Sequence, residues 1–344
     1  MIRSFRLRDS YLLQKLARQR VPLHLERHLT QPRWPLGLAL SAPVPWYGSG
    51  AATFVVDRQS SDNNLPDGFV QATKHLGRSE ADVYYIAPRL GRDEKTPDTW
   101  RTLLKYLGAH AGDFGIQRLY ACLPAREEAA EIVASSGFVL YARETLYRLR
   151  PSRQERGISG EEYVRPQREI DSFALQRLSD RHTPPVIQKA EGAFLKKNDP
   201  NDNHRLIFQN WWQPERLEGL VYEQDSEILG AVRIRRGSKG HWLHFLGDAT
   251  RQDVMAALLN QALRQLQQDN HPIYCGVRSY QSALGPVLTA RAFEPGIELA
   301  RFVKYAAVHV REPVSAKTRL MVKTSFPSVI SSDVAPKTKT STPD

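Results

Sequence analysis

The sequence predicts two α/β domains of the same kind in tandem, each a mixed, mostly antiparallel sheet flanked by helices. Two observations lead to this prediction. Apolar helical stripes and short apolar strands alternate along the 344 residues, and the same order of elements recurs 155 residues later. The length suits about two domains of ordinary size.

A helical stripe after Pro97 is the clearest element of the repeat. Its apolar residues have the i, i+3, i+4, i+7, i+11 spacing of one helix face, and they are Trp100, Leu103, Leu104, Leu107 and Ala111. Adding 155 to each number gives a second apolar stripe, formed by Met255, Leu258, Leu259, Ala262 and Leu266. The two stripes predict helices over residues 97–112 and 251–268.

Each helix is followed by the same series of elements. Short apolar strands are predicted at 119–123 and 273–277, and second helices at about 125–136 and 281–291. Phe138 and Phe293 come next, again 155 apart, and each half ends in an alternating segment, 139–149 or 297–308.

The starts of the two halves also agree. Asp9 is predicted to cap a helix that carries Leu12, Leu13 and Leu16, and helical spacing recurs at 169–180. Three strands follow in each half, at 51–56, 68–73 and 83–87, and at 217–222, 228–235 and 241–246. The alternative is one large α/β domain in which the helices match by coincidence.

Composition marks the boundaries of these domains. We expect a first domain at residues 1–150, a polar linker at 151–162 and a second domain at 163–312. The segment 313–344 is rich in Ser, Thr, Lys and Pro and has no helical or strand period, so we expect a disordered tail.

This order of elements, with a late helix that ends at a small residue and a phenylalanine, resembles the GNAT acyltransferase superfamily. The resemblance rests on strand residues 83–88 and the sequence SSGF at 135–138, and on HWLHFLGD at 241–248 and ARAF at 290–293. It spans most of the chain as a pattern of elements. It implies a tandem GNAT fold that transfers an acyl group from acetyl-CoA, or another acyl-CoA, directly to the amine of a small molecule or peptide.

The family's CoA site lies in the loop before the central helix, where glycines and free amides hold the pyrophosphate. Here the first loop, 88–96, has one glycine. The resemblance implies that a CoA site in this half would use Ile86, Ala87, Arg89, Gly91, Arg92 and Lys95. The alternative is a solvated basic loop balanced by acidic neighbours.

The second loop, 247–253, is the weaker candidate for CoA binding. Thr250 and Asp253 have the spacing to cap the following helix, much like a capping box. Asp248 and Asp253 would repel a pyrophosphate at this place.

No catalytic residue is assigned by the sequence. The position of the family's proton-donating tyrosine is Val133 in the first half and Leu288 in the second, and neither can carry a proton. Tyr84 and His244, each on a predicted central strand, are the candidate catalytic residues, and each also suits a structural role. Two functions therefore stay open: an acyl-CoA-dependent N-acyltransferase, and a catalytically inactive GNAT-fold binding or regulatory module.

Composition argues against several other classes. No apolar run reaches the roughly 18 residues of a membrane helix, and no apolar segment follows the charged N-terminus, so we expect a cytoplasmic protein without a membrane partner. Cys122 and Cys275 lie in apolar segments without metal-ligand spacing, so no metal is expected. The net charge of +11 is spread along the chain, so a nucleic acid is not an expected partner.

Overall fold

The computed structural model describes residues 2–47, 50–56, 65–75, 79–91, 93–125, 128–150, 162–191 and 216–306. The predicted tail at 313–344 lies outside these residues. So does the predicted linker at 151–162, except for Glu162, and so does Arg92 among the predicted site residues.

The first half has the predicted order, with short elements added near the N-terminus. Its helices are α1 (Ser10–Ala17), α2 (Leu25–Thr30), α3 (Pro35–Leu40), α4 (Thr96–Asp113) and α5 (Glu128–Ser135), preceded by the 3-10 helix η1 (Leu7–Asp9). Its strands are β1 (Ile2–Ser4), β2 (Val21–Pro22), β3 (Ala51–Val56), β4 (Gly68–Lys74), β5 (Glu80–Ala87), β6 (Arg118–Pro124) and β7 (Val139–Leu149).

The second half repeats the main elements in the same order, which confirms the predicted fold class. Its helices are α6 (Ser172–His182), α7 (Pro185–Glu191), α9 (Gln252–Leu266) and α10 (Leu284–Thr289), with 3-10 helices η3 (Glu169–Asp171) and η5 (Ser279–Gln281). Its strands are β8 (Val164–Pro166), β9 (Arg216–Gln224), β10 (Glu227–Arg236), β11 (His241–Gly247), β12 (Ile273–Arg278) and β13 (Glu294–Tyr305).

The predicted helical stripes form the two main cores. The stripe of α4 is buried against β3, β4 and β6, and its central residue Trp100 is fully buried, with its indole N–H donating to the Pro88 carbonyl at 2.8 Å. The stripe of α9 is buried against β9 to β12 in the same way. Each stripe removes a full face of apolar side chains from water, which stabilises a helix far more than propensity alone.

The prediction that Asp9 caps the first helix was wrong. The Asp9 carboxylate accepts from the Arg3 guanidinium at 2.7 Å and from the Arg6 backbone N–H at 2.8 Å, and makes no cap bond to α1. Asp171 makes the same bonds to Arg165 and Arg168 in the second half. The repeat therefore extends to an Arg–Asp pair that ties the first strand of each half to the turn that follows.

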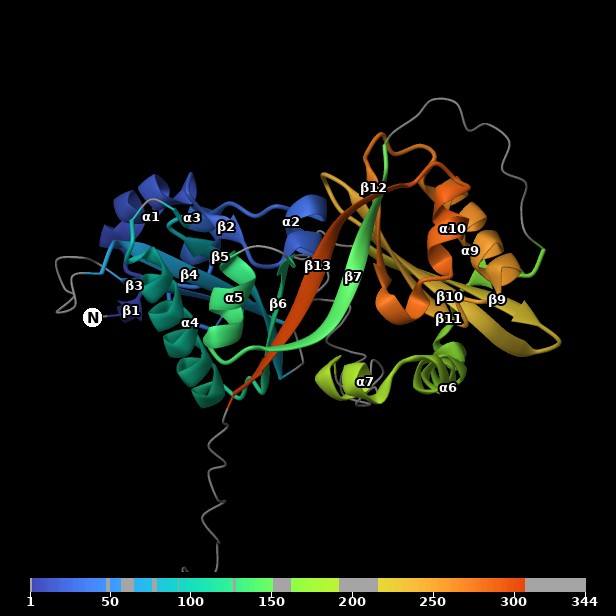
Figure 1. Cartoon of the computed structure of the whole chain (residues 1–344), viewed down its shortest axis with the longest axis horizontal. Coiled ribbons are helices and arrows are strands. Elements are labelled where there is room, and N and C mark those ends of the chain that lie inside the picture. The colour runs from blue at the N-terminus through green and yellow to red at the C-terminus, as the bar shows by residue number, and fades with distance from the viewer. Residues whose placement is uncertain are drawn as a thin grey trace, which may run out of the picture. The chain divides into compact units, whose positions relative to one another are not determined.

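The last strands of the two halves are exchanged. Within the described residues the strand order is β1-β3-β4-β5-β6-β13-β7-β12-β11-β10-β9-β8, with β2 beside β5. The C-terminal strand β13 thus pairs with β6 of the first half, and β7 pairs with β12 of the second. Figure 1 shows β7 and β13 running side by side between the two halves.

The exchange is an addition to the predicted repeat, and the domain boundaries at 150 and 163 stay a prediction. It also explains a glycine in α4. A Cβ on Gly108 would lie 2.5 Å from the Lys304 side chain, which comes from β13 and donates to the Ser136 carbonyl at 2.8 Å.

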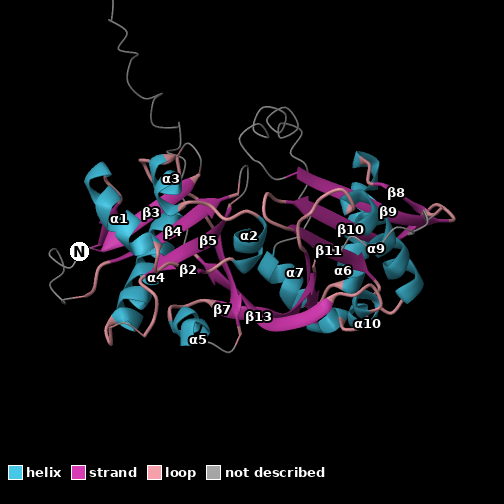
Figure 2. Ribbon diagram, turned by 90° about the horizontal axis from the view of Figure 1, so that it is seen from above, coloured by secondary structure: helices cyan, strands magenta, loops and turns pink. Residues whose placement is uncertain are grey.

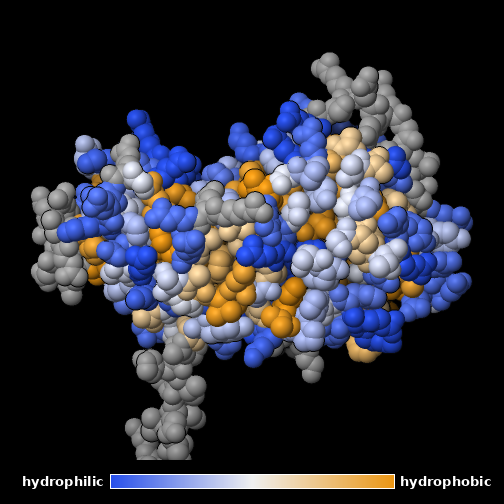
Figure 3. All heavy atoms as spheres, in the orientation of Figure 1, coloured by the Kyte–Doolittle hydropathy of each residue, from blue (hydrophilic) through white to orange (hydrophobic). Residues whose placement is uncertain are grey.

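Apolar residues reach the surface over the middle of the face in Figure 3, and β7 and β13 expose Val139, Leu140 and Ile297.

Helix α2 lies at the junction of the halves. It contacts β6 of the first half and β11 of the second, and Figure 2 shows it near the middle of the row of strands. A side chain of α2 can therefore reach the second half although it belongs to the first.

The exchange predicts a specific cross-link. Tyr147 of β7 lies directly opposite Cys275 of β12. Because paired strand residues lie within disulfide distance, we expect Tyr147→Cys to form an intramolecular disulfide with Cys275 when the protein is refolded under oxidising conditions, detected by peptide mass spectrometry. The control Arg143→Cys lies opposite Ala300 and should give no such link. Absence of the Tyr147→Cys link in folded protein would show that β7 returns to its own half.

Candidate functional site

Each half contains a wedge between two parallel strands that separate. In the first half, β5 and β6 pair only from Glu80↔Arg118 to Asp82↔Tyr120, although both strands continue. In the second half, β11 and β12 pair only from His241↔Ile273 to Leu243↔Cys275. We call these openings the first wedge and the second wedge.

The first wedge is filled by the chain itself. Val21 and Pro22 pair with Ile86 and Tyr85 of β5, and the Leu23 N–H donates to the Tyr84 carbonyl at 3.0 Å. On the other side, the Cys122 N–H of β6 donates to the Leu23 carbonyl at 2.7 Å. Residues 21–24, the inserted segment, thus act as a short strand between β5 and β6.

Asp82 holds the inserted segment in place. Its carboxylate is buried at the point where β5 and β6 separate, 2.7 Å from Arg27 Nε, 3.4 Å from His24 Nε2 and 2.8 Å from His75 Nε2. Burial alone would raise the pKa of Asp82, but the neighbouring His24, His75 and Arg27 charges hold it well below its usual value.

The predicted first-half site residues that the structure describes divide into buried and exposed ones. Ile86 and Ala87 are fully buried, and Tyr84 is buried with its hydroxyl donating to the Gln31 carbonyl at 3.2 Å. Arg89, Gly91 and Lys95 are exposed, with Gly91 at φ +83°. The inserted segment occupies the facing edges of β5 and β6, and the CoA site at these residues stays a prediction.

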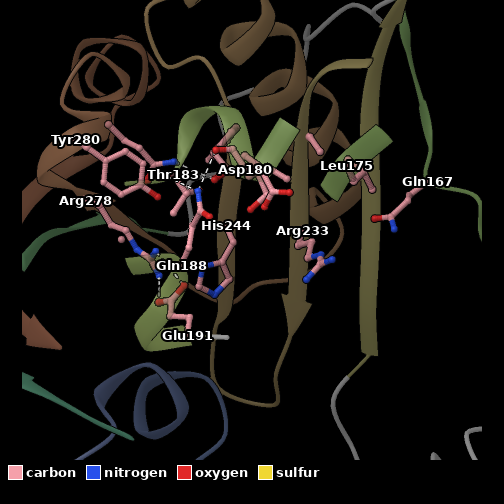
Figure 4. Close-up of a pocket in the computed structure, with 16 residues that line it drawn as sticks. Gln167, Leu175, Asp180, Thr183, Gln188, Glu191, Arg233, His244, Arg278 and Tyr280 are labelled. Carbon is pink, nitrogen blue, oxygen red and sulfur yellow. Dashed lines mark hydrogen bonds and ion pairs between the residues drawn. The ribbon is translucent and has the colours of Figure 1, made fainter. Parts of the chain in front are cut away.

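The second wedge is a cleft with a cavity volume of about 70 Å³, and about 800 Å³ of unfilled space when the part open to solvent is counted. One wall is formed by His244, Phe245 and Leu246 of β11, and the other by Gly276 and Arg278 of β12. Residues of α6 and α7 close the third side, and Figure 4 shows His244, Arg278 and Tyr280 around the same space.

His244 is the predicted candidate that the structure places in this cleft. Its Nε2 lies 3.0 Å from Oε1 of Glu26, a buried residue of α2. Burial raises the pKa of Glu26, yet the charges of His244, Arg235 and Arg301 outweigh it and hold the pKa well below the usual value. An ionised carboxylate only accepts hydrogen bonds, so the His244 Nε2 that faces Glu26 is the donor in this contact.

Glu26 is itself fixed by residues of the exchanged strand and of β10. Arg301 of β13 donates to Glu26 at 3.2 Å and to Glu144 of β7 at 2.7 Å. Arg235 Nε lies 3.4 Å from Glu26. No local spacing in the sequence marks Glu26, because it meets His244 across 218 positions.

Other polar groups shape the floor of the cleft. Glu191 pairs with Arg278 and accepts from the Tyr141 hydroxyl at 3.1 Å. The buried Gln281 amide donates to the Phe245 carbonyl at 3.1 Å, across the separated strands. Tyr280, which sequence reasoning did not single out, lines the cleft just beyond β12.

The start of α9 differs from the prediction, and the positions of the family's tyrosine are buried. The predicted cap by Thr250 and Asp253 was wrong, because α9 has no side-chain cap bond and Asp248 bonds Thr250 instead. Val133 and Leu288 are fully buried core residues, in agreement with their exclusion as acids.

The described residues contain neither a membrane-spanning helix nor a metal-binding cluster. None of the described helices combines the length and apolar character needed to cross a membrane. Among the described residues, no group of three His, Cys, Asp or Glu residues could hold a metal ion. Cys122 is buried, and burial raises the pKa of its thiol to about 12.

Comparison with solved structures identifies the fold. A tandem GNAT protein from the clavulanic acid biosynthesis pathway matches with a TM-score of 0.52 at 11% identity, over 89% of this chain and 98% of that protein. A GCN5-related N-acetyltransferase from Sphaerobacter thermophilus matches with a TM-score of 0.50 at 12% identity, over 89% and 95%. No protein-family model and no curated protein matches the sequence. These likenesses show a tandem GNAT fold, as the sequence predicts.

Asp82 should stabilise the protein in a pH-dependent way. Its folded pKa lies below the usual 3.8, so its contribution is present above that value and is lost as the pH falls through the folded pKa. We expect Asp82→Asn to lower the free energy of unfolding by about 3–5 kcal/mol at neutral pH, because the cations around it lose their partner. In the wild type, the free energy of unfolding should fall as the pH drops from about 5 to about 2. This fall should be smaller in the variant, as measured by urea denaturation.

The matched control is Asp98→Asn, which removes an exposed carboxylate paired with Arg101 on α4. It should change stability by less than about 1 kcal/mol. An equal loss in both variants would contradict the role assigned to Asp82.

Proposed function

We propose that this tandem GNAT-fold chain is an N-acyltransferase whose active site is the second wedge. It would transfer an acyl group from a pantetheine thioester, such as acetyl-CoA, to the amine of a small molecule or peptide. One observation carries the proposal: the first wedge holds the inserted segment, whereas the second is an open cleft with His244 on its wall. The proposal differs from the sequence-based expectation of CoA near Ile86 to Arg92.

The backbone of the second wedge supports an extended, amide-bearing donor. The His241 N–H bonds the Pro272 carbonyl. Because alternate residues of a strand turn their peptide groups to the same side, the peptide groups of Phe245 face β12. The inserted segment gives an internal precedent, since an extended chain bonds both edges of the first wedge. A pantetheine arm has the same extended form and carries two amides.

His244 is the proposed general base. The amine nitrogen attacks the thioester carbonyl carbon, a C–N bond forms, and the C–S bond breaks. Nδ1 of His244 takes the proton that the amine loses and returns it, directly or through water, to the departing thiolate, which becomes the thiol. The products are an amide and the free thiol, so atoms and charges balance. Glu26 holds the ring through Nε2 and stabilises its protonated form, as carboxylates do beside catalytic histidines.

The acidic groups of the cleft support an amine as acceptor. Glu191 lines it but is paired with Arg278, whereas Asp180 lines it and is exposed at its edge. Carboxylates raise the local concentration of a cationic amine. A cationic amine loses one proton to solvent before it attacks, and His244 takes the second proton as the C–N bond forms.

A catalytically inactive binding module is the second candidate. The Gln281 amide already bonds the Phe245 carbonyl, one of the groups that a donor arm would use. A module of this kind would bind a ligand in the second wedge without turnover. Thiol release from acetyl-CoA in the presence of a panel of amines separates the two functions.

His244→Ala and Glu26→Gln test the proposed chemistry. We expect His244→Ala to lower kcat about 10²–10⁴-fold, because general-base catalysis contributes that much, with little change in donor binding. Glu26→Gln keeps the shape and loses the charge beside the ring, so we expect about a tenfold loss in kcat at unchanged KM. Both are measured by thiol release, with folding checked by circular dichroism.

Two controls match these variants. Tyr84→Phe changes the other sequence-predicted candidate, which is buried in the first half, and should leave kcat unchanged. Glu144→Gln removes the other carboxylate that pairs with Arg301 but does not touch His244. If Glu144→Gln lowers kcat as much as Glu26→Gln, the effect comes from Arg301 and not from His244.

A further inference from the structure

The turn before each central helix is closed by an aspartate at the same position of the repeat. Asp248 Oδ1 accepts from the Thr250 N–H at 2.9 Å and from its hydroxyl at 2.6 Å. Asp93 Oδ1 accepts from the Lys95 N–H at 2.9 Å. The two aspartates are 155 residues apart, the period of the repeat.

The neighbouring amides of these turns are also bonded internally. The Arg251 N–H donates to the Asp248 carbonyl at 3.1 Å, and the Gln252 N–H to the Thr250 carbonyl at 2.9 Å. In the first half the Thr96 N–H donates to the Asp93 carbonyl at 2.9 Å. A diphosphate is held at a helix start by amides that point outward. Three successive amides before α9 are instead used within the turn.

The negative charge of the second turn also disfavours a bound diphosphate. The hydrogen bonds from Thr250 lower the pKa of Asp248, so its carboxylate is ionised at neutral pH. Asp253 adds a second carboxylate in the first turn of α9, beside Arg251. A diphosphate placed here would meet two negative groups, and the Thr250, Arg251 and Gln252 amides are already bonded within the turn.

The cleft of the second wedge, unlike this turn, is open. It is lined by residues of β10, β11 and β12, with His244 among them, and by residues of α6 and α7. We infer that the protein recognises its donor through the pantetheine thioester arm alone, and not through an adenosine diphosphate. The substrate class is therefore pantetheine thioesters, whatever the far end of the arm carries. This inference rests on the proposed function of the second wedge.

The test compares two probes on the full chain by calorimetry, acetyl-CoA and S-acetyl-pantetheine. We expect their dissociation constants to agree within about threefold. A cradled diphosphate would add charge-assisted hydrogen bonds, which correspond to about tenfold or more in affinity. Acetyl-CoA binding at least tenfold tighter overturns the inference and leaves the proposed function standing. If neither probe binds, the proposed function fails together with the inference.

A matched pair of variants tests the physical cause. Asp248→Gly frees the Thr250 amide and removes a negative charge, so we expect the preference for acetyl-CoA over S-acetyl-pantetheine to rise about tenfold. Asp93→Gly makes the same change in the first half and should leave the preference unchanged. An unchanged preference in folded Asp248→Gly, or an equal rise in both variants, contradicts the role assigned to the second turn.

Discussion

The exchange of β7 and β13 is the constraint on which the rest of the structure depends. Because β13 completes the sheet of the first half and β7 that of the second, the halves share one hydrogen-bonded sheet within the described residues. The exchanged strands also carry Glu144 and Arg301 into the junction, where Arg301 fixes Glu26. A buried charge network of this kind costs desolvation, and it is stable only when every member has a partner. Its placement brings a carboxylate of the first half to His244 of the second.

The two wedges lie at corresponding places in the two halves but differ in what occupies them. In the first, the strand edges are bonded by residues 21–24, and the Asp82 carboxylate pairs with Arg27 and lies beside His24 and His75. In the second, the edges border an open cleft, and the buried charge lies behind the histidine of its wall. A duplicated fold can keep its scaffold with only one ligand site, because the chemistry belongs to particular residues and not to the fold.

Local patterns predicted most of the fold. The stripes of α4 and α9 and the long alternating strands follow from period alone. That the loop at Asp248 is a poor pyrophosphate site stays a prediction from its charge. The exchange could not be predicted, because β7 offers the same alternating pattern to β6 and to β12. Glu26 was missed for a related reason: no local spacing marks a carboxylate that meets its histidine 218 positions away. Asp9 was misassigned because a capping signal looks the same when the carboxylate binds an arginine of the preceding strand.

The central claim is that ligand binds in the second wedge and not in the first. Hydrogen–deuterium exchange with and without saturating S-acetyl-pantetheine tests it directly, because backbone amides at a bound strand edge become protected. We expect slower hydrogen–deuterium exchange in peptides that cover His241–Gly247 and Ile273–Arg278. We expect no change in peptides that cover Glu80–Ala87 and Arg118–Pro124. Protection confined to the first-half peptides would contradict it.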